Sequence, residues 1–296
     1  MIVELNTQYK RMKRRLAKGS QEIKADPIHR PHGEEIVRQA SAQAAHSRGN
    51  SRLLIVADEW KQMYVLADFL KTHGYEVQCV KQNSLESDLS QYAGVFMFIH
   101  RTFEPHAEKA LIDYAKNGGR LIVLHHGIAS GKVENPEWLR FTGIYIAAKD
   151  DPNYPWRVVR GTHTLANLQP NHYITSHNVE YDRMIDYQSS DSPSLPHKYP
   201  ALDLHDTEVF LNQHFTDGRE KTVLFGFHYR DEETREAIMQ DRSGWYKPVR
   251  KGWLFHLQPG HSESDFKNRN YAQIILNCLT WKPEMGTASE ASQQAV

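Results

Sequence analysis

The sequence has few cysteines and no long apolar run. It contains only two cysteines, Cys79 and Cys278, and neither stands in a Cys-x-x-Cys pair, which excludes a disulfide scaffold and a thiolate zinc site. The longest apolar runs, Val95–Ile99 and Leu121–Leu124, are far shorter than the roughly 20 residues of a membrane span. The N-terminus has no apolar signal core. We therefore expect a cytoplasmic protein with no membrane partner.

The chain also lacks a net charge, because 36 Lys and Arg residues balance 36 Asp and Glu residues. This balance argues against a nucleic-acid partner. The one local exception is residues 1–52, where 11 Lys and Arg face 5 Asp and Glu. We predict a basic N-terminal extension over residues 1–50. It is interpreted as an arm for an anionic partner, as a solvated helix or leader, or as a surface that packs on a second subunit in a homo-oligomer.

Strand and helix patterns alternate from residue 51 onward. Continuous apolar runs predict buried parallel strands, and apolar residues at helical spacing predict the helices between them. The predicted strands of this half are 53–57, 76–80, 94–99 and 121–124, with helices around 63–70 and from 105 to 117. The short connections favour an open, doubly wound, mostly parallel α/β sheet.

The second half is less regular. Turn-forming residues predict a loop over 188–206, and polar residues predict an insertion over 231–245 with a short helix in it. Further strands are predicted at 208–211, 222–229 and 252–257, a last helix at 268–279, and a disordered tail at 285–296. The insertions near 183–206 and 230–248 are expected to form a lid or a partner surface.

Polar residues gather where the predicted strands end. Ligands of open α/β sheets bind beyond the carboxyl ends of the parallel strands, so these positions are the candidate site. The residues are Asp58, Glu59 and Trp60 after the first strand, His100 and Arg101 after the third, His125 and His126 after the fourth, and Gln258 to His261 after the last. Histidine is abundant, with 17 residues in the chain.

The turn after the fourth strand is where several α/β enzymes place a serine or cysteine nucleophile. Here it carries His125, and the nearby Ser130 lacks the Gly-x-Ser-x-Gly frame. The Gly-x-Gly-x-x-Gly fingerprint is absent, and the carboxylates after the first strand would repel a flavin phosphate. Imidazole at this turn instead suits metal ligation, general acid–base catalysis or a contact with a sugar hydroxyl.

Four ordered motifs resemble the ThuA-like (trehalose utilisation) family. They are Gly118-Gly-Arg-Leu-Ile-Val-Leu-His125, Asp206-Thr-Glu-Val-Phe210, Gly252-Trp-Leu-Phe-His-Leu-Gln-Pro-Gly-His261 and Ile274-Ile-Leu-Asn-Cys-Leu-Thr-Trp281. The resemblance implies a flavodoxin-like, class I glutamine amidotransferase-like domain over residues 51–284, without the catalytic cysteine. It also implies a link to carbohydrate metabolism.

The resemblance further implies a pocket built from His125, Glu208 and His261, our candidate catalytic residues. Two imidazoles and one carboxylate form a facial set that leaves coordination positions open, so a divalent metal such as zinc is one interpretation and a metal-free polar pocket the other. The candidate substrate-binding residues are Glu59, Trp60, His100, Arg101 and His126. Trp60 is either a platform for a sugar ring or a packing residue.

Two functions follow from these residues. The first is an enzyme that hydrolyses, isomerises or eliminates from a small-molecule carbohydrate, with help from His and Glu. The alternative is a non-catalytic sugar-binding or assembly module with the same fold. A glutamine amidotransferase ranks lowest because the nucleophilic cysteine is missing.

Overall fold

The computed structural model describes most of the chain from residue 51 onward. The described residues are 51–146, 151–152, 155–191, 196–231 and 234–283. The predicted basic extension (1–50) and the predicted tail (285–296) lie outside them, so both stay predictions. Among the described helices, none is long and apolar enough to cross a membrane.

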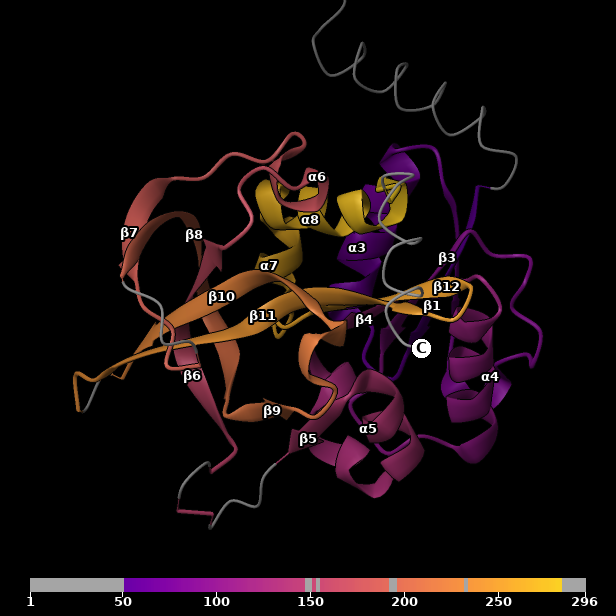
Figure 1. The fold of residues 1–296 in the computed structure, drawn as a ribbon. Coiled ribbons are helices and arrows are strands. Elements are labelled where there is room, and N and C mark those ends of the chain that lie inside the picture. The colour runs from indigo at the N-terminus through magenta and orange to yellow at the C-terminus, as the bar shows by residue number, and fades with distance from the viewer. Residues whose placement is uncertain (1–50, 147–150, 153–154, 192–195, 232–233, 284–296) are drawn as a thin grey trace, which may run out of the picture. The chain divides into compact units, whose positions relative to one another are not determined.

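The main sheet has ten strands, in the order β2-β1-β3-β4-β12-β11-β10-β6-β8-β7 (Figure 1). Its strands are β1 (Arg52–Ala57), β2 (Glu76–Val80), β3 (Gly94–Phe98), β4 (Arg120–Leu124), β6 (Arg157–Asn167), β7 (Arg183–Tyr187), β8 (His197–Leu211), β10 (Thr222–Arg230), β11 (Ala237–Val249) and β12 (Gly252–Leu257). A small second sheet pairs β5 (Ile144–Ile146) with β9 (Gln213–Phe215).

The helices cover both faces of the sheet's parallel half. They are α3 (Lys61–Thr72), α4 (Pro105–Lys116), α5 (Pro136–Thr142), α6 (Tyr173–Ser176), α7 (Glu263–Lys267) and α8 (Arg269–Thr280). Side chains alternate across β1, so that Leu53 and Ile55 join one core with α3 and α8, and Leu54 and Val56 join another with α4 and α5. The predicted doubly wound α/β fold is therefore confirmed.

The strands of the first half were predicted nearly to the residue, because β1, β3 and β4 are buried on both faces and the edge strand β2 is a short run between clear turn signals. β2, β1, β3, β4 and β12 run parallel, with direct register between neighbours such as Val56 with Met97 and Leu257 with Leu124. Their carboxyl ends therefore meet at one edge of the sheet, as the candidate site requires.

Two predictions for the second half are wrong. Residues 197–206 of the predicted loop belong to β8, which pairs with β6 on one side and β7 on the other. Residues 237–245 of the predicted insertion belong to β11, an antiparallel strand between β10 and β12. Both strands hide polar side chains, Thr207 on β8 and Gln240 and Ser243 on β11, which hydrogen-bond instead of contacting solvent. The sequence of these strands therefore shows no clear apolar alternation. Within the described residues these segments extend the main sheet and do not form a separate lid.

Candidate functional site

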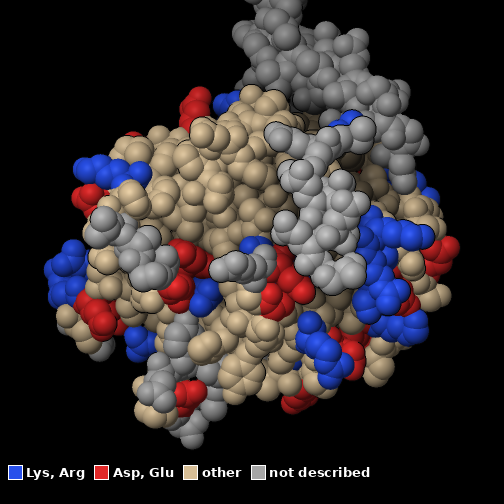
Figure 2. All heavy atoms as spheres, in the orientation of Figure 1, with Lys and Arg blue, Asp and Glu red and all other residues tan. Residues whose placement is uncertain are grey.

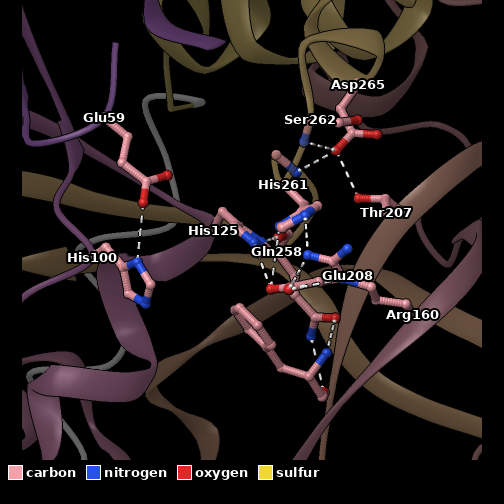
Figure 3. Close-up of polar contacts among 12 residues, drawn as sticks. Glu59, His100, His125, Arg160, Thr207, Glu208, Gln258, His261, Ser262 and Asp265 are labelled. Carbon is pink, nitrogen blue, oxygen red and sulfur yellow. Dashed lines mark hydrogen bonds and ion pairs between the residues drawn. The ribbon is translucent and has the colours of Figure 1, made fainter. Parts of the chain in front are cut away.

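Four predicted site residues meet beyond the carboxyl ends of β4 and β12, and Figure 3 shows three of them, His125, Glu208 and His261. His125 and His126 follow β4, His261 follows β12, and Glu208 reaches across from β8. One potential ligand atom from each lies within 4.8 Å of the others. We call these residues the His–Glu cluster. The structure thus brings the three candidate catalytic residues together and adds His126 to them.

The backbone at His125 adopts a left-handed conformation. Its φ is +43°, an uncommon value for a residue with a Cβ, at the start of a 3-10 turn over His125–Ile128. The ring is fully buried and stacks on Phe210 with ring centroids 4.6 Å apart. Strain of this kind persists only where the surroundings enforce it, and it aims the imidazole back over the sheet edge.

Gln258 fixes the orientation of His125. Nδ1 of His125 lies 2.7 Å from the Gln258 backbone oxygen, which can only accept, so Nδ1 carries a proton. The Gln258 side chain pairs with both backbone polar groups of Phe210, which joins β8 to the end of β12. Nε2 of His125 consequently points at Glu208, with 3.5 Å between Nε2 and the carboxylate oxygen.

Glu208 stands at an irregularity of β8. The pairing of β6 with β8 changes register between Gly161 and His163, and Asp206 has a φ of +52°. Burial alone would raise the pKa of the Glu208 carboxyl group, but the contacts with His125 and His261 outweigh it and hold this pKa well below its ordinary range. Glu208 is therefore an anion at neutral pH.

A neutral His125 presents an unprotonated Nε2 to this anion. Two lone pairs face one another there, and a cation relieves the repulsion, either a second proton on His125 or a metal ion. Within the described residues, His125 Nε2, His126 Nδ1 and His261 Nδ1 are buried and have no hydrogen-bond partner.

His261 is placed by its backbone turn and by Arg160. Gln62 at the start of α3 donates to the His261 backbone oxygen at 2.8 Å. Nδ1 of His261 lies 3.3 Å from Glu208, and the Arg160 guanidinium donates to Nε2 at 2.9 Å. Because Nε2 accepts there, the ring proton of a neutral His261 lies on Nδ1. His261 therefore binds a metal through Nδ1 only when Arg160, whose side chain is 68% exposed, moves away.

Asp265 supports both sides of the cluster from beneath. Its buried carboxylate accepts hydrogen bonds from the Thr207 hydroxyl at 2.7 Å and from the backbone N–H groups of Gly260 and Ser262 at 3.1 and 3.2 Å. Thr207 precedes Glu208, and Gly260 precedes His261. Burial raises the pKa of Asp265 even though these donors lower it.

The ring planes of the three cluster histidines cross steeply. The interplanar angles are 57° for His125 and His126, 66° for His125 and His261, and 79° for His126 and His261. Steeply crossed planes can share one point, which a metal bound in the plane of each ring must occupy. Burial, followed by the neighbouring histidines, lowers the pKa of His126 to about 2, so this ring is neutral.

The distances also fit a metal. Two ligand atoms on a tetrahedral zinc, each about 2.0–2.1 Å from the ion, lie roughly 3.3–3.4 Å apart. Glu208 lies 3.5 Å from His125 and 3.3 Å from His261.

Glu59 and His100 form a second group beside the cluster. Glu59 contacts His100 Nδ1 at 3.1 Å, and the His100 ring stacks on His126 with centroids 4.0 Å apart and planes 9° apart. Two parallel rings at this spacing have no common in-plane point, so His100 and His126 do not suit the same metal ion. A pocket of about 520 Å³ opens here, lined by Glu59, His100 and Arg101 among others.

The remaining candidates divide. Arg101 is among the residues that line this pocket, and its backbone N–H and that of His100 donate to Asp58. Trp60 is not among the pocket's lining residues, stacks on Tyr64 at 5.9 Å and packs against the core, which is the packing alternative.

Comparison with known proteins identifies the family to which this chain belongs. The profile of the ThuA family, described as trehalose utilisation, matches residues 54–282. The chain belongs to the ThuA family. This membership confirms the predicted resemblance and points to a role in carbohydrate utilisation. Among curated proteins, none matches the chain.

One solved structure shares the fold of this ThuA chain at a TM-score above 0.5, and two others are similar at lower scores. A ThuA-like protein from Bacteroides uniformis shares 14% identity at a TM-score of 0.53, over 78% of this chain and 90% of its own. A protein described as a GMP synthase subunit, from Thermoplasma acidophilum, shares 10% identity at a TM-score of 0.40, over 77% and 92%. A beta-galactosidase from Bacillus circulans shares 10% identity at 0.46, over 78% of this chain and 31% of its own.

Sequence analysis missed the supporting residues. Arg160 lies on β6, a strand that was not predicted, directly across from Glu208. Asp265 carried a usable signal, because Ser262 and Asp265 have the spacing of a capping box at the start of α7. Gln258 was placed at this edge of the sheet by the sequence, but nothing in the sequence indicated its buried contacts with Phe210.

Proposed function

We propose that this ThuA-family protein is a carbohydrate-processing enzyme that holds a divalent transition metal, such as zinc, in the His–Glu cluster. The observation that carries the proposal is that Nε2 of His125 faces the Glu208 carboxylate while its Nδ1 donates to the Gln258 backbone oxygen, within a set of buried ring nitrogens whose planes cross. Imidazole and carboxylate are the ligands that zinc and related ions take in open sites.

A metal held there would polarise a sugar hydroxyl or carbonyl group and lower the pKa of a bound water. The side chains of the neighbouring pocket supply the rest of the site. Glu59 and His100 form a pair suited to proton transfer, and Arg101 offers donors to hydroxyl or anionic groups of the substrate. The pocket volume of about 520 Å³ accommodates a small saccharide.

The experiment measures metal and turnover separately. Protein purified without chelators is analysed for bound metal and titrated with Co²⁺, and hydrolysis or isomerisation of trehalose and related sugars is followed by NMR. We expect one metal per chain, with binding abolished in His125→Ala and Glu208→Ala. His106→Ala, which removes an exposed histidine outside the cluster, is the matched control.

Other outcomes contradict parts of the proposal. Metal-free protein that turns over a sugar would show that the cluster acts through protons alone. Sugar binding without metal or turnover would favour the non-catalytic module. That alternative has support in the Arg160–His261 hydrogen bond, which satisfies Nε2 of His261 without a metal.

A further inference from the structure

A second pocket lies at the other end of β12 from the His–Glu cluster. It has a volume of about 610 Å³ and is bounded by α6, the end of α8 and the starting half of β12, and we call it the α6–α8 pocket. Trp253 lines it, whereas the cluster begins beyond Leu257. Because a strand rises about 3.3 Å per residue, these two residues alone lie about 13 Å apart. The two pockets are therefore separate sites.

The walls of the α6–α8 pocket are aromatic and meet at an angle. Trp253 and Trp281 have ring centroids 4.9 Å apart and planes at 85°, and Tyr246 lies 4.7 Å from Trp281. Tyr173, 37% exposed, closes another side from α6. Such a corner fits a compact ring better than an extended chain. The C–H groups on one face of a sugar ring are attracted to the electron-rich face of an aromatic ring.

Polar groups without negative charge complete the lining. Thr280 bonds to the Tyr173 hydroxyl at 3.0 Å, and His172 bonds to the Tyr246 hydroxyl at 3.3 Å. Asn171 and Lys282 add exposed donors at the rim. None of the described lining residues carries a carboxylate, and the positive charge of Lys282 at the rim repels a cationic ligand, which opposes the attraction of the aromatic faces for cations. The polar rim disfavours a lipid chain. Figure 2 shows a broad, mainly uncharged surface over α6 and α8.

We propose that the α6–α8 pocket is a second, non-catalytic binding site for a neutral saccharide of one or two rings. Its volume lies within the range of about 300–1,000 Å³ of small-molecule sites. The partly exposed rings of Trp253 and Tyr173 supply the contact area, backed by the largely buried rings of Tyr246 and Trp281. Asn171, Thr280 and Lys282 supply hydrogen bonds to hydroxyl groups. The proposal does not depend on a metal in the His–Glu cluster, because the two sites share no residue.

The test titrates the full chain with glucose, maltose and trehalose up to about 10 mM, roughly ten times a weak dissociation constant of about 1 mM. Calorimetry and tryptophan fluorescence report binding. We expect at least one saccharide to bind, and Trp253→Ala to lower its association constant about tenfold or more. Tyr145→Ala, which truncates an exposed aromatic residue on β5, is the matched control and retains binding. His125→Ala, which disrupts the His–Glu cluster, should also retain saccharide binding at the α6–α8 pocket.

Two results would overturn the proposal. The first is that none of the three saccharides binds the wild-type chain. The second is that binding is lost in His125→Ala and kept in Trp253→Ala, which places the sugar at the His–Glu cluster alone. If Trp253→Ala unfolds, Tyr173→Ala decides the question, because that residue is partly exposed and is expected to weaken binding without loss of the fold.

Discussion

Asp265 is the residue whose loss should most clearly separate stability from site geometry. In Asp265→Ala, the Thr207 hydroxyl and the Gly260 and Ser262 N–H groups lose their acceptor. Each buried donor left without a partner costs about 1–3 kcal/mol, and removal of a costly buried charge offsets part of the sum. We expect a net loss of about 3–5 kcal/mol from the free energy of unfolding, a large share of the roughly 5–15 kcal/mol of a typical domain.

Asp265→Asn is the matched variant. Its amide oxygen can accept from the same three donors, while its NH₂ group takes the place of the oxygen Oδ1, which has no partner among the described residues. We expect a smaller loss of about 1–3 kcal/mol. The cluster should follow the same order, with Co²⁺ affinity much reduced in Asp265→Ala and largely kept in Asp265→Asn.

Urea unfolding and Co²⁺ titration measure the two effects, and pH adds a third. The pKa of Asp265 is raised above its ordinary 3.8, so the native state binds more protons than the unfolded state just above pH 3.8. The stabilising contribution of this group therefore falls as pH rises through that window, a slope that Asp265→Asn should lack. Wild-type stability in Asp265→Ala would refute the hydrogen-bond reasoning. Unchanged Co²⁺ affinity in a destabilised Asp265→Ala would refute its positioning role.

Three further substitutions test other parts of the structure. Gly260 has a φ of +139°, and a Cβ added there would lie 3.1 Å from atoms of His125 and Phe266. Gly260→Ala should therefore lower the free energy of unfolding by about 2–3 kcal/mol in urea. The control Gly218→Ala, at φ +57° with open space around it, should lower it by only about 1 kcal/mol. Lys132 donates hydrogen bonds to backbone oxygens after β3, and burial lowers its pKa to about 7. Between pH 7 and 10.5 the unfolded chain therefore binds more protons than the native chain, so the contribution of Lys132 to the free energy of unfolding should rise with pH. Lys132→Met should remove that rise when unfolding is measured as a function of pH. Arg160→Gln should raise the Co²⁺ affinity severalfold in calorimetry, because it releases His261 from its hydrogen bond with Arg160. Equal affinity in Arg160→Gln and in the control Arg157→Gln, at an exposed residue of the same strand, would contradict the idea that Arg160 competes with the metal for His261.

The parallel half of the fold was predictable because its signals are local. A strand such as Leu53–Ala57, apolar on both faces, has few alternatives to the middle of a sheet. In the antiparallel half, β10 was predicted at 222–229, but β11 was not, because β11 is paired on both sides yet buries polar residues such as Ser243 that bond to other side chains. Its pattern of solvent-facing and buried residues exists only once the neighbouring strands are in place.

Some residues of the candidate site were predictable from the sequence for the same reason, and others were not. His125 and His261 were predictable because they follow buried parallel strands, whose carboxyl ends share one edge. Glu208 was found through the family motif and not through periodicity. The strand that carries it, β8, was predicted only for its last four residues, so the sequence did not show where this strand lies in the sheet. The role of Arg160 was beyond reach, because it depends on the register of β6 with β8.

The cluster joins segments that fold from different parts of the chain. His125 belongs to the parallel half, Glu208 to the antiparallel half, and His261 to the turn after β12, the last parallel strand. An ion held by all three would tie these segments together across the sheet, so its binding energy would also oppose their separation. Loss of the metal would then weaken the contacts between the parallel and antiparallel halves under conditions in which each half stays folded.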